Sequence, residues 1–283
     1  MKIKLPLSMA FLAMFLLNQA FAQRTVPLEF NNDGHLYIKV AINDQDSARL
    51  MFDTGGGVNI ISAELFDKIH STLREAGLHT GTRHNGEKIT GMLYQIPSVS
   101  IGGFRKTGVT AGKLDAPVPY DGIISMNFFE DVPVTLDFVN RKLIIETETS
   151  LSKISPAAER IPIRLFRNGK DELSFFVTIC LDDKEKAEAE FDTGSSANML
   201  MLQPRYMALL NIIKPAGDNN DYGYYKYSAT LPKLSYCNTG LFKNNVFVGF
   251  KEGLIFDGLI GYGMFLDKKL TIDIQKSEMF VWK

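Results

Sequence analysis

The chain has 283 residues, and 45% of them are hydrophobic. Its formal net charge is −1 at neutral pH, and the sequence contains no basic block of residues. These values are typical of a globular protein with a substantial core, and they argue against nucleic acid and anionic membrane surfaces as partners.

The first 22 residues have the pattern of a secretory signal peptide. Lys2 and Lys4 precede an uncharged, mostly apolar run over residues 5–17, and a small-x-small cleavage site ends at Ala22. The apolar run is shorter than the ~20 residues that a membrane-spanning helix needs. We therefore expect cleavage after Ala22, no membrane anchor in the mature protein, and a secreted or periplasmic location.

The rest of the chain reads as a duplicated unit. The tripeptide Asp-Thr-Gly occurs at Asp53–Gly55 and again at Asp192–Gly194. In each half, short strands, a glycine turn and a polar hairpin lead into this tripeptide. Each half continues with a helix-like segment and, later, with Asp-Gly, apolar residues and a hairpin-like pair of strands. A repeat of short, alternating strands predicts a mainly-β protein built from two similar units.

The duplication sets the expected domain boundaries. We expect residues 23–152 to form an N-terminal lobe and residues 153–283 a C-terminal lobe, within a monomer. In the first lobe, Ser62 is the expected N-cap of a helix over residues 63–77. In the second lobe, Pro204 suits the first turn of a short helix.

Two similar lobes can meet about a pseudo-twofold axis, which brings equivalent loops face to face. Asp53 and Asp192 would then be neighbours. Because two adjacent carboxylates do not both ionise easily, they would share a proton. One carboxyl group is then a base and the other an acid at the same pH, which suits activation of a water molecule and protonation of a carbonyl oxygen.

The residues that follow each aspartate fit this arrangement. Gly55 and Gly194 allow backbone N–H groups to approach the carboxylates closely. The hydroxyl groups of Thr54 and Thr193 can form hydrogen bonds across the contact between the lobes.

On these motifs the sequence resembles the retropepsin-like and pepsin-like aspartic peptidases, from about Pro27 to the C-terminus. The resemblance rests on DTGG at Asp53, DTGS at Asp192, and the later DGIIS and DGLIG stretches that begin at Asp121 and Asp257. It implies a mainly-β fold, a pseudo-twofold pair of β-barrel lobes with the active site between them, and no cofactor.

The resemblance also implies a role for each motif residue. Asp53 and Asp192 would form the catalytic dyad, whereas Asp121 and Asp257 would lie in a supporting motif. The residues expected to support the active site are Thr54, Gly55, Thr193, Gly194 and Ser195.

Two positions depart from a symmetric pattern. Ser125 stands where the family's first-lobe motif has glycine, so we expect the packing behind Asp53 to be looser or slightly rearranged. Gly56 follows the first motif, whereas Ser195 follows the second. A serine hydroxyl can donate a hydrogen bond to its carboxylate and favour the charged form. We therefore expect Asp192 to be the ionised partner more often and Asp53 the protonated one.

The family closes over its substrate with a β-hairpin, and the sequence offers a candidate in each lobe. Asn85-Gly86 is a strong hairpin-turn signal at the expected place, and an ordinary surface hairpin is the alternative. In the second lobe, Tyr222 and Tyr224 cluster near Gly223 and could contact a substrate. They could equally be strand residues or a sugar-stacking surface.

Cysteines and histidines carry little signal of their own. Export permits a disulfide between Cys180 and Cys237, but two cysteines do not make a disulfide framework, and a small buried side chain is the favoured reading of Cys180. His79 and His84 frame a turn-like stretch without neighbouring ligands at metal spacing, so we expect solvated loop histidines and no metal.

The leading functional hypothesis is a secreted aspartic endopeptidase that acts on peptides or proteins. The alternative is an exported peptide- or glycan-binding protein on a catalytically silent fold, and Ser125 is the feature that favours it. A structural two-barrel protein with coincidental motifs is a third possibility. The two intact Asp-Thr-Gly motifs favour the peptidase.

Overall fold

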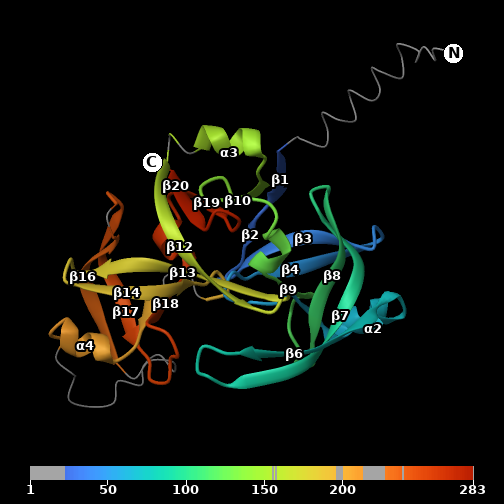
Figure 1. Cartoon of the computed structure of the whole chain (residues 1–283), viewed down its shortest axis with the longest axis horizontal. Helices are drawn as coiled ribbons and strands as arrows, with labels where there is room; N and C mark the ends of the chain where they lie inside the picture. Colours follow the sequence, from blue (N-terminus) through green and yellow to red (C-terminus); the bar gives the residue numbers. More distant parts are fainter. Residues whose placement is uncertain are drawn as a thin grey trace, which may run out of the picture.

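The computed structural model describes residues 23–154, 156, 158–195, 200–212, 227–237 and 239–282. Two lobes built from β-strands lie next to each other under a shared sheet (Figure 1). The first lobe is coloured blue to green in Figure 1, and the second yellow to red. The predicted fold class, a mainly-β chain with barrel lobes, is confirmed.

Six strands of the first lobe close into a barrel. Their order is β3-β4-β9-β5-β8-β7, and β3 also pairs with β7, which closes the ring. A further strand, β2, extends this sheet beside β3 and β6 extends it beside β7. The strands are β2 (Glu29–Phe30), β3 (Leu36–Ile42), β4 (Asp46–Phe52), β5 (Ile60–Ser62), β6 (Arg74–Thr82), β7 (Lys88–Ile101), β8 (Phe104–Leu114) and β9 (Gly122–Ile124).

The second lobe repeats this topology. Its order is β13-β14-β18-β15-β17-β16, and pairing of β13 with β16 closes the ring. Strand by strand, this is the order of the first barrel, so the internal duplication in the sequence corresponds to a duplication of structure. The strands are β13 (Glu172–Leu181), β14 (Glu185–Phe191), β15 (Leu200–Leu202), β16 (Tyr227–Tyr236), β17 (Phe242–Phe250) and β18 (Gly258–Ile260).

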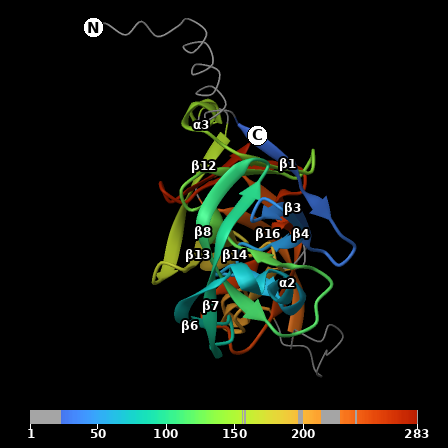
Figure 2. The same ribbon diagram turned by 90° about the vertical axis from the view of Figure 1, so that its right-hand side faces the viewer.

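A six-stranded sheet joins the lobes, in the order β1-β11-β10-β19-β20-β12. The antiparallel pairing of β10 with β19 crosses from one lobe to the other, and there the Thr135 and Thr271 hydroxyls lie 2.6 Å apart. Figures 1 and 2 both show α3 over this sheet, and the tip of the β6–β7 hairpin at the other end of the molecule. The elements are β1 (Arg24–Pro27), β10 (Val134–Asp137), β11 (Lys142–Ile145), α3 (Glu148–Ile154), β12 (Ala158–Asn168), β19 (Lys269–Asp273) and β20 (Glu278–Trp282).

The helices are short. Ser62 caps α2 (Ala63–Ile69), because its side chain accepts a hydrogen bond from the Leu65 N–H at 3.1 Å. The expected helix to residue 77 is wrong. Pairing of β6 with β7 takes over after the 3₁₀ turn η1 (His70–Thr72).

The remaining helical elements also follow the duplication. In the second lobe Pro204 precedes α4 (Arg205–Leu209). The 3₁₀ turns η2 (Met126–Phe129) and η4 (Tyr262–Phe265) follow the two Asp-Gly stretches. In the described part of the chain, no helix has the length and apolar character needed to cross a membrane.

Cys180 and Cys237 form a disulfide, with their Cα atoms 5.2 Å apart. The sequence-based preference for an unpaired Cys180 is therefore wrong. The register of β13 with β16 places Cys180 opposite Ser235, two residues before Cys237. This pairing joins segments 57 residues apart, so nothing local in the sequence signals it.

We predict that replacing both cysteines with serine lowers the free energy of unfolding by about 2–4 kcal/mol, because the open chain gains entropy in the unfolded state. Urea unfolding with and without a reductant would measure this. The wild type should lose stability on reduction, and the double variant should not respond to the reductant. An unchanged unfolding midpoint after complete reduction of the wild type would contradict the prediction.

Candidate active site

Strand alternation places the two Asp-Thr-Gly motifs on matching faces of the two barrels. Phe52 ends β4 and Phe191 ends β14, and both side chains are fully buried in the hydrophobic core. Successive strand residues point to opposite faces. The residues on either side of each phenylalanine therefore point away from the barrel interior, and these include Asp53 and Asp192.

A reciprocal set of hydrogen bonds locks the two motif loops together. The Thr54 N–H donates to Thr193 Oγ1 at 3.0 Å, and the Thr193 N–H donates to Thr54 Oγ1 at 3.0 Å. Each hydroxyl then donates across the contact, from Thr54 to the Phe191 carbonyl at 2.5 Å and from Thr193 to the Phe52 carbonyl at 2.7 Å. Both threonines are completely buried, so the two loops are held as one unit.

Glycine is required at the next position because each loop touches the opposite carboxylate. A Cβ atom on Gly55 would lie only 2.7 Å from Asp192 Cγ, and one on Gly194 would lie still closer to Asp53 Cγ. The Gly55 N–H donates to Asp53 Oδ1 at 2.9 Å, and the Gly194 N–H donates to Asp192 Oδ1 at 2.8 Å. The two carboxyl groups are therefore packed against each other across the lobe contact.

The hydrogen bonding of the two carboxylates is unequal. Ser195 donates to Asp192 twice, from its N–H at 3.2 Å and from its hydroxyl at 2.5 Å. In the first lobe, Gly56 has no side chain to offer. Burial, and then the charge of Asp192, raise the pKa of Asp53 well above its ordinary value. Asp53 is thus the partner that keeps a proton, which is the direction that the sequence predicted.

The structure accommodates Ser125 without loosening the site. Ser125 is fully buried, and its N–H and hydroxyl lie 3.0 Å and 3.3 Å from Asn59 Oδ1. Its backbone is extended at φ −97°, close to the φ of −76° at Gly261 in the second lobe. Glycine is therefore not needed for this backbone conformation, and the serine hydroxyl has a partner in Asn59.

The supporting aspartates anchor the motif strands from behind. Asp121 Oδ2 accepts a hydrogen bond from the Arg49 N–H at 2.6 Å, and Asp257 Oδ2 accepts one from the Glu188 N–H at 3.0 Å. The two bonds are equivalent, since each reaches the residue four positions before a motif aspartate. Asp121 and Asp257 thus tie β4 and β14 to the neighbouring loops.

The Asn85-Gly86 signal forms the turn of the β6–β7 hairpin. The Gly86 N–H donates to the Arg83 carbonyl at 2.8 Å, and Gly86 has a φ of +83°, which favours glycine. The hairpin reaches the second lobe (Figure 1). At its tip, the Ile255 N–H donates to the His84 carbonyl at 3.0 Å, so the hairpin bridges the two lobes.

Two histidines take part in this bridge. His79 Nε2 lies 3.0 Å from Glu172 Oε2, and His84 Nε2 lies 3.0 Å from Lys251 Nζ. The expectation of solvated loop histidines is therefore wrong for His79 and His84. Their partners belong to the other lobe, and no local sequence pattern announces such contacts. Tyr222 and Tyr224 lie outside the described residues.

Sequence reasoning missed a third carboxyl group near the dyad. Glu190 is 7% exposed and lies two residues before Asp192 on β14. Burial, and then the charge of Asp192, raise the pKa of Glu190 to about 8. An alignment of the two halves could have found it, because the equivalent residue of the first lobe is Met51.

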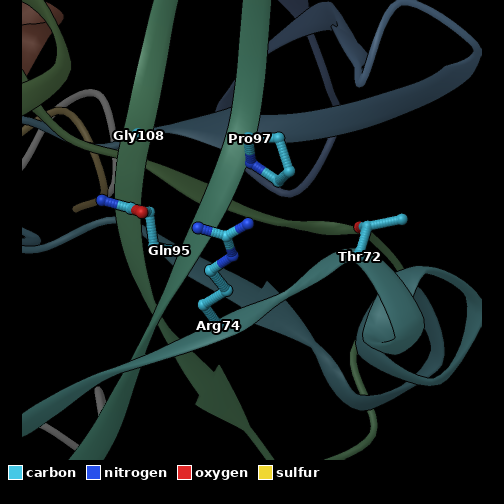
Figure 3. A pocket seen from close by; sticks show the side chains of 5 residues that line it. All are labelled: Thr72, Arg74, Gln95, Pro97 and Gly108. Carbon is cyan, nitrogen blue, oxygen red and sulfur yellow. The ribbon is translucent and has the colours of Figure 1, made fainter.

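A separate hollow of about 220 Å³ lies on the first lobe (Figure 3). It contains none of the predicted site residues. Its lining residues are Thr72, Arg74, Gln95, Pro97 and Gly108. Within the described ranges, no three His, Cys, Asp or Glu side chains are grouped so that they could hold a metal ion.

We predict that acid loosens the hairpin tip. Burial, and then the charge of Lys251, lower the pKa of His84, while Arg83 lowers it further and Asp192 opposes them. A released His84 would have its ordinary pKa of about 6.5. Below that pH the released state binds the extra proton, so docking weakens by up to about tenfold per pH unit until the docked His84 is protonated too.

Hydrogen exchange of the Ile255 amide would measure this release, because that N–H is bonded to His84. His84→Gln is the matched control, since glutamine keeps a neutral acceptor and does not titrate. Exchange in the wild type should accelerate relative to this variant between pH 7 and pH 5. Parallel exchange in both proteins across this range would refute the prediction.

Comparison with known proteins supports the predicted resemblance of the first lobe to aspartic peptidases. Residues 38–128 match a family model described as aspartyl protease. The match contains the first Asp-Thr-Gly and the DGIIS stretch, and it ends before the second lobe. A search of curated proteins found no match. Over residues 38–128, the first lobe is thus similar to the aspartyl protease family.

Proposed function

We propose that this protein is an exported aspartic endopeptidase that hydrolyses peptide bonds with a water molecule activated between Asp53 and Asp192. The observation that carries the proposal is the reciprocal locking of the two Asp-Thr-Gly loops. It holds the two carboxyl groups against each other, and Ser195, which has Gly56 as its counterpart, makes them unequal in hydrogen bonding. Such a pair supplies an acid and a base at the same pH.

The proposed reaction follows from the asymmetry of the pair. Asp192, which accepts two hydrogen bonds from Ser195, takes a proton from the water as its oxygen attacks the scissile carbonyl carbon. Asp53, whose pKa is raised, gives its proton to the carbonyl oxygen. The C–N bond of the tetrahedral intermediate then breaks. The amine leaves with the proton held by Asp192, and Asp53 regains its proton from a hydroxyl of the intermediate, so no covalent intermediate forms.

The β6–β7 hairpin is suited to cover an extended substrate. His79 and Gly81 share one face of β6, and that face turns toward Glu172 of the second lobe. Across the hairpin, His79 pairs with Gly91 and Gly81 pairs with Ile89. A Cβ atom on Gly91 would meet nothing within 4 Å, which leaves room for a peptide backbone. The peptide would add to the hairpin as a strand adds to a sheet edge.

Export is part of the proposal. The N-terminal pattern that ends at Ala22 has the features of a signal peptide. The Cys180–Cys237 disulfide supports an oxidising compartment, because such bonds are rare in the cytosol. We propose that the mature protein begins at Gln23 and acts as a two-lobed monomer on peptides or proteins, in the periplasm or outside the cell.

The binding-protein alternative loses the feature that favoured it. Ser125 does not disturb the site, since its hydroxyl contacts Asn59 and its backbone is extended. Both Asp-Thr-Gly motifs are also intact, which a protein that only bound peptides or glycans would have little need to keep.

We predict that Asp192→Asn abolishes peptide hydrolysis, with a loss of at least about a thousandfold in kcat/KM, because the variant has no base for the water. The full chain would be expressed, the exported protein purified, and a mixed peptide library digested from pH 3 to pH 8. Hydrolysis by the wild type and not by the variant would support the peptidase. If neither protein cleaves while both bind peptides or glycans equally well, the binding-protein reading replaces it.

A second prediction concerns the acidic limb of the pH–rate profile. Ser195→Ala removes a hydrogen bond that favours the charged form of the Asp192 carboxylate. The acidic limb should therefore move to higher pH. Ser150→Ala, in α3 and far from the dyad in the fold, is a control that should leave the limb in place. An acidic limb that coincides in wild type and Ser195→Ala would argue against the assigned roles.

A further inference from the structure

Glu190 is a buried carboxyl group for which the proposed hydrolysis has no use. Phe191 points into the barrel core, so strand alternation places Glu190 and Asp192 on the same face of β14. Glu190 also contributes to the raised pKa of Asp53. Its carboxyl group is therefore close to both members of the dyad.

In the described part of the chain, no cation pairs with Glu190. The groups that act on its carboxyl are Asp192, the hydroxyl of Ser174 and the charge of Glu172. Two basic side chains of the described residues contact carboxylates other than Glu190. Arg164 binds Glu188 at 2.9 Å, and His79 binds Glu172. A buried carboxylate is costly without a partner, so a cation brought by a ligand would be stabilised here.

The two cross-strand neighbours of Glu190 are apolar. Phe176 lies directly opposite on β13, and Leu259 lies alongside on β18. Leu259 belongs to a small cluster of buried residues with Met201 and Leu254, separate from the main core. A carboxyl group beside apolar side chains, with no cation paired to it in the described residues, suits a ligand group with a long apolar stem and a cationic end, which describes lysine and arginine.

The first lobe has no such carboxyl at the matching position. Met51 lies two residues before Asp53, and it pairs with Tyr37 as Glu190 pairs with Phe176. The two barrels thus offer different chemistry beside equivalent aspartates. A substrate that passes between them would meet a carboxyl group on one side of the reacting bond and a thioether on the other.

We propose that Glu190 selects substrates that carry lysine or arginine next to the scissile bond, on the side bound by the second lobe. This rests on the proposed peptide hydrolysis. Strand residues two apart are separated by about 6.6 Å, so Glu190 lies that far along β14 from Asp192. The stem of a flanking lysine or arginine spans this distance, and its cation pairs with the Glu190 carboxylate. The side bound by Met51 takes an apolar residue.

Two peptides that differ only in lysine or norleucine at the flanking position test this inference. Norleucine keeps the stem and lacks the ammonium group. In the wild type, kcat/KM should favour the lysine peptide by roughly 10- to 100-fold, as expected for a desolvated charge pair. Glu190→Gln should bring the ratio close to one. Glu188→Gln, the same change two residues earlier at the ion pair with Arg164, should keep the wild-type ratio.

The measured ratios of kcat/KM either support or overturn the role of Glu190. A wild-type ratio near one, with lysine placed on either side of the bond, overturns the inference, and so does a lysine preference that survives in Glu190→Gln. If the wild type cleaves neither peptide, the proposed hydrolysis fails separately. Calorimetric binding of the same two peptides then tests Glu190. Tighter binding of the lysine peptide by the wild type and not by Glu190→Gln supports the inference, and equal binding overturns it.

Discussion

The hydrogen bonds between Thr54 and Thr193 are the constraint on which the site depends. Each threonine uses both its N–H and its hydroxyl across the lobe contact, and both are completely buried. Parting the loops without admitting water would leave several polar groups unpaired, each at a cost of about 1–3 kcal/mol. The shared sheet has a similar threonine pair where β10 of one lobe pairs with β19 of the other, because the Thr135 and Thr271 hydroxyls form a hydrogen bond there. The positions of the two carboxyl groups are thus fixed by the way in which the lobes join.

The scaffold of the site is symmetric, but its chemistry is not. The threonine bonds, the close-packed glycines and the supporting aspartates occur once in each lobe with nearly equal geometry. The differences lie at two positions beside the aspartates. Ser195 stands against Gly56, and Glu190 against Met51. In a duplicated protein the repeated residues maintain the fold, so the positions where the copies differ are the ones to examine for specialised chemistry.

Much of the site could be predicted because its signals are local. Asp-Thr-Gly, the Asn85-Gly86 turn and the strand pattern each occupy a few consecutive residues, and the duplication shows that they recur in the same order. Sequence reasoning failed where a residue depends on a distant partner. The disulfide needs the pairing of β13 with β16, and the end of α2 needs the pairing of β6 with β7.

The same limit explains the errors at single residues. Ser125 is accommodated by Asn59, 66 positions away, and His84 meets Lys251 of the other lobe, 167 positions away. Such contacts follow from the completed fold, because no periodicity or motif links the two members of either pair. Glu190 is different. It stands where the first lobe has Met51, and a position-by-position comparison of the two halves would have exposed this difference.

The docking of the hairpin tip and the protonation of the dyad both depend on pH. The hairpin tip is tied to the second lobe through the His84 carbonyl and through the contact of its ring with Lys251. A neutral His84 accepts a hydrogen bond from the lysine, whereas a protonated one repels it. Acidification therefore frees the hairpin over the pH range in which Asp53, with its raised pKa, still holds the proton that hydrolysis requires. In the proposed peptidase, the hairpin stays docked at higher pH while Asp53 approaches ionisation, so we expect substrate entry and hydrolysis to decline together.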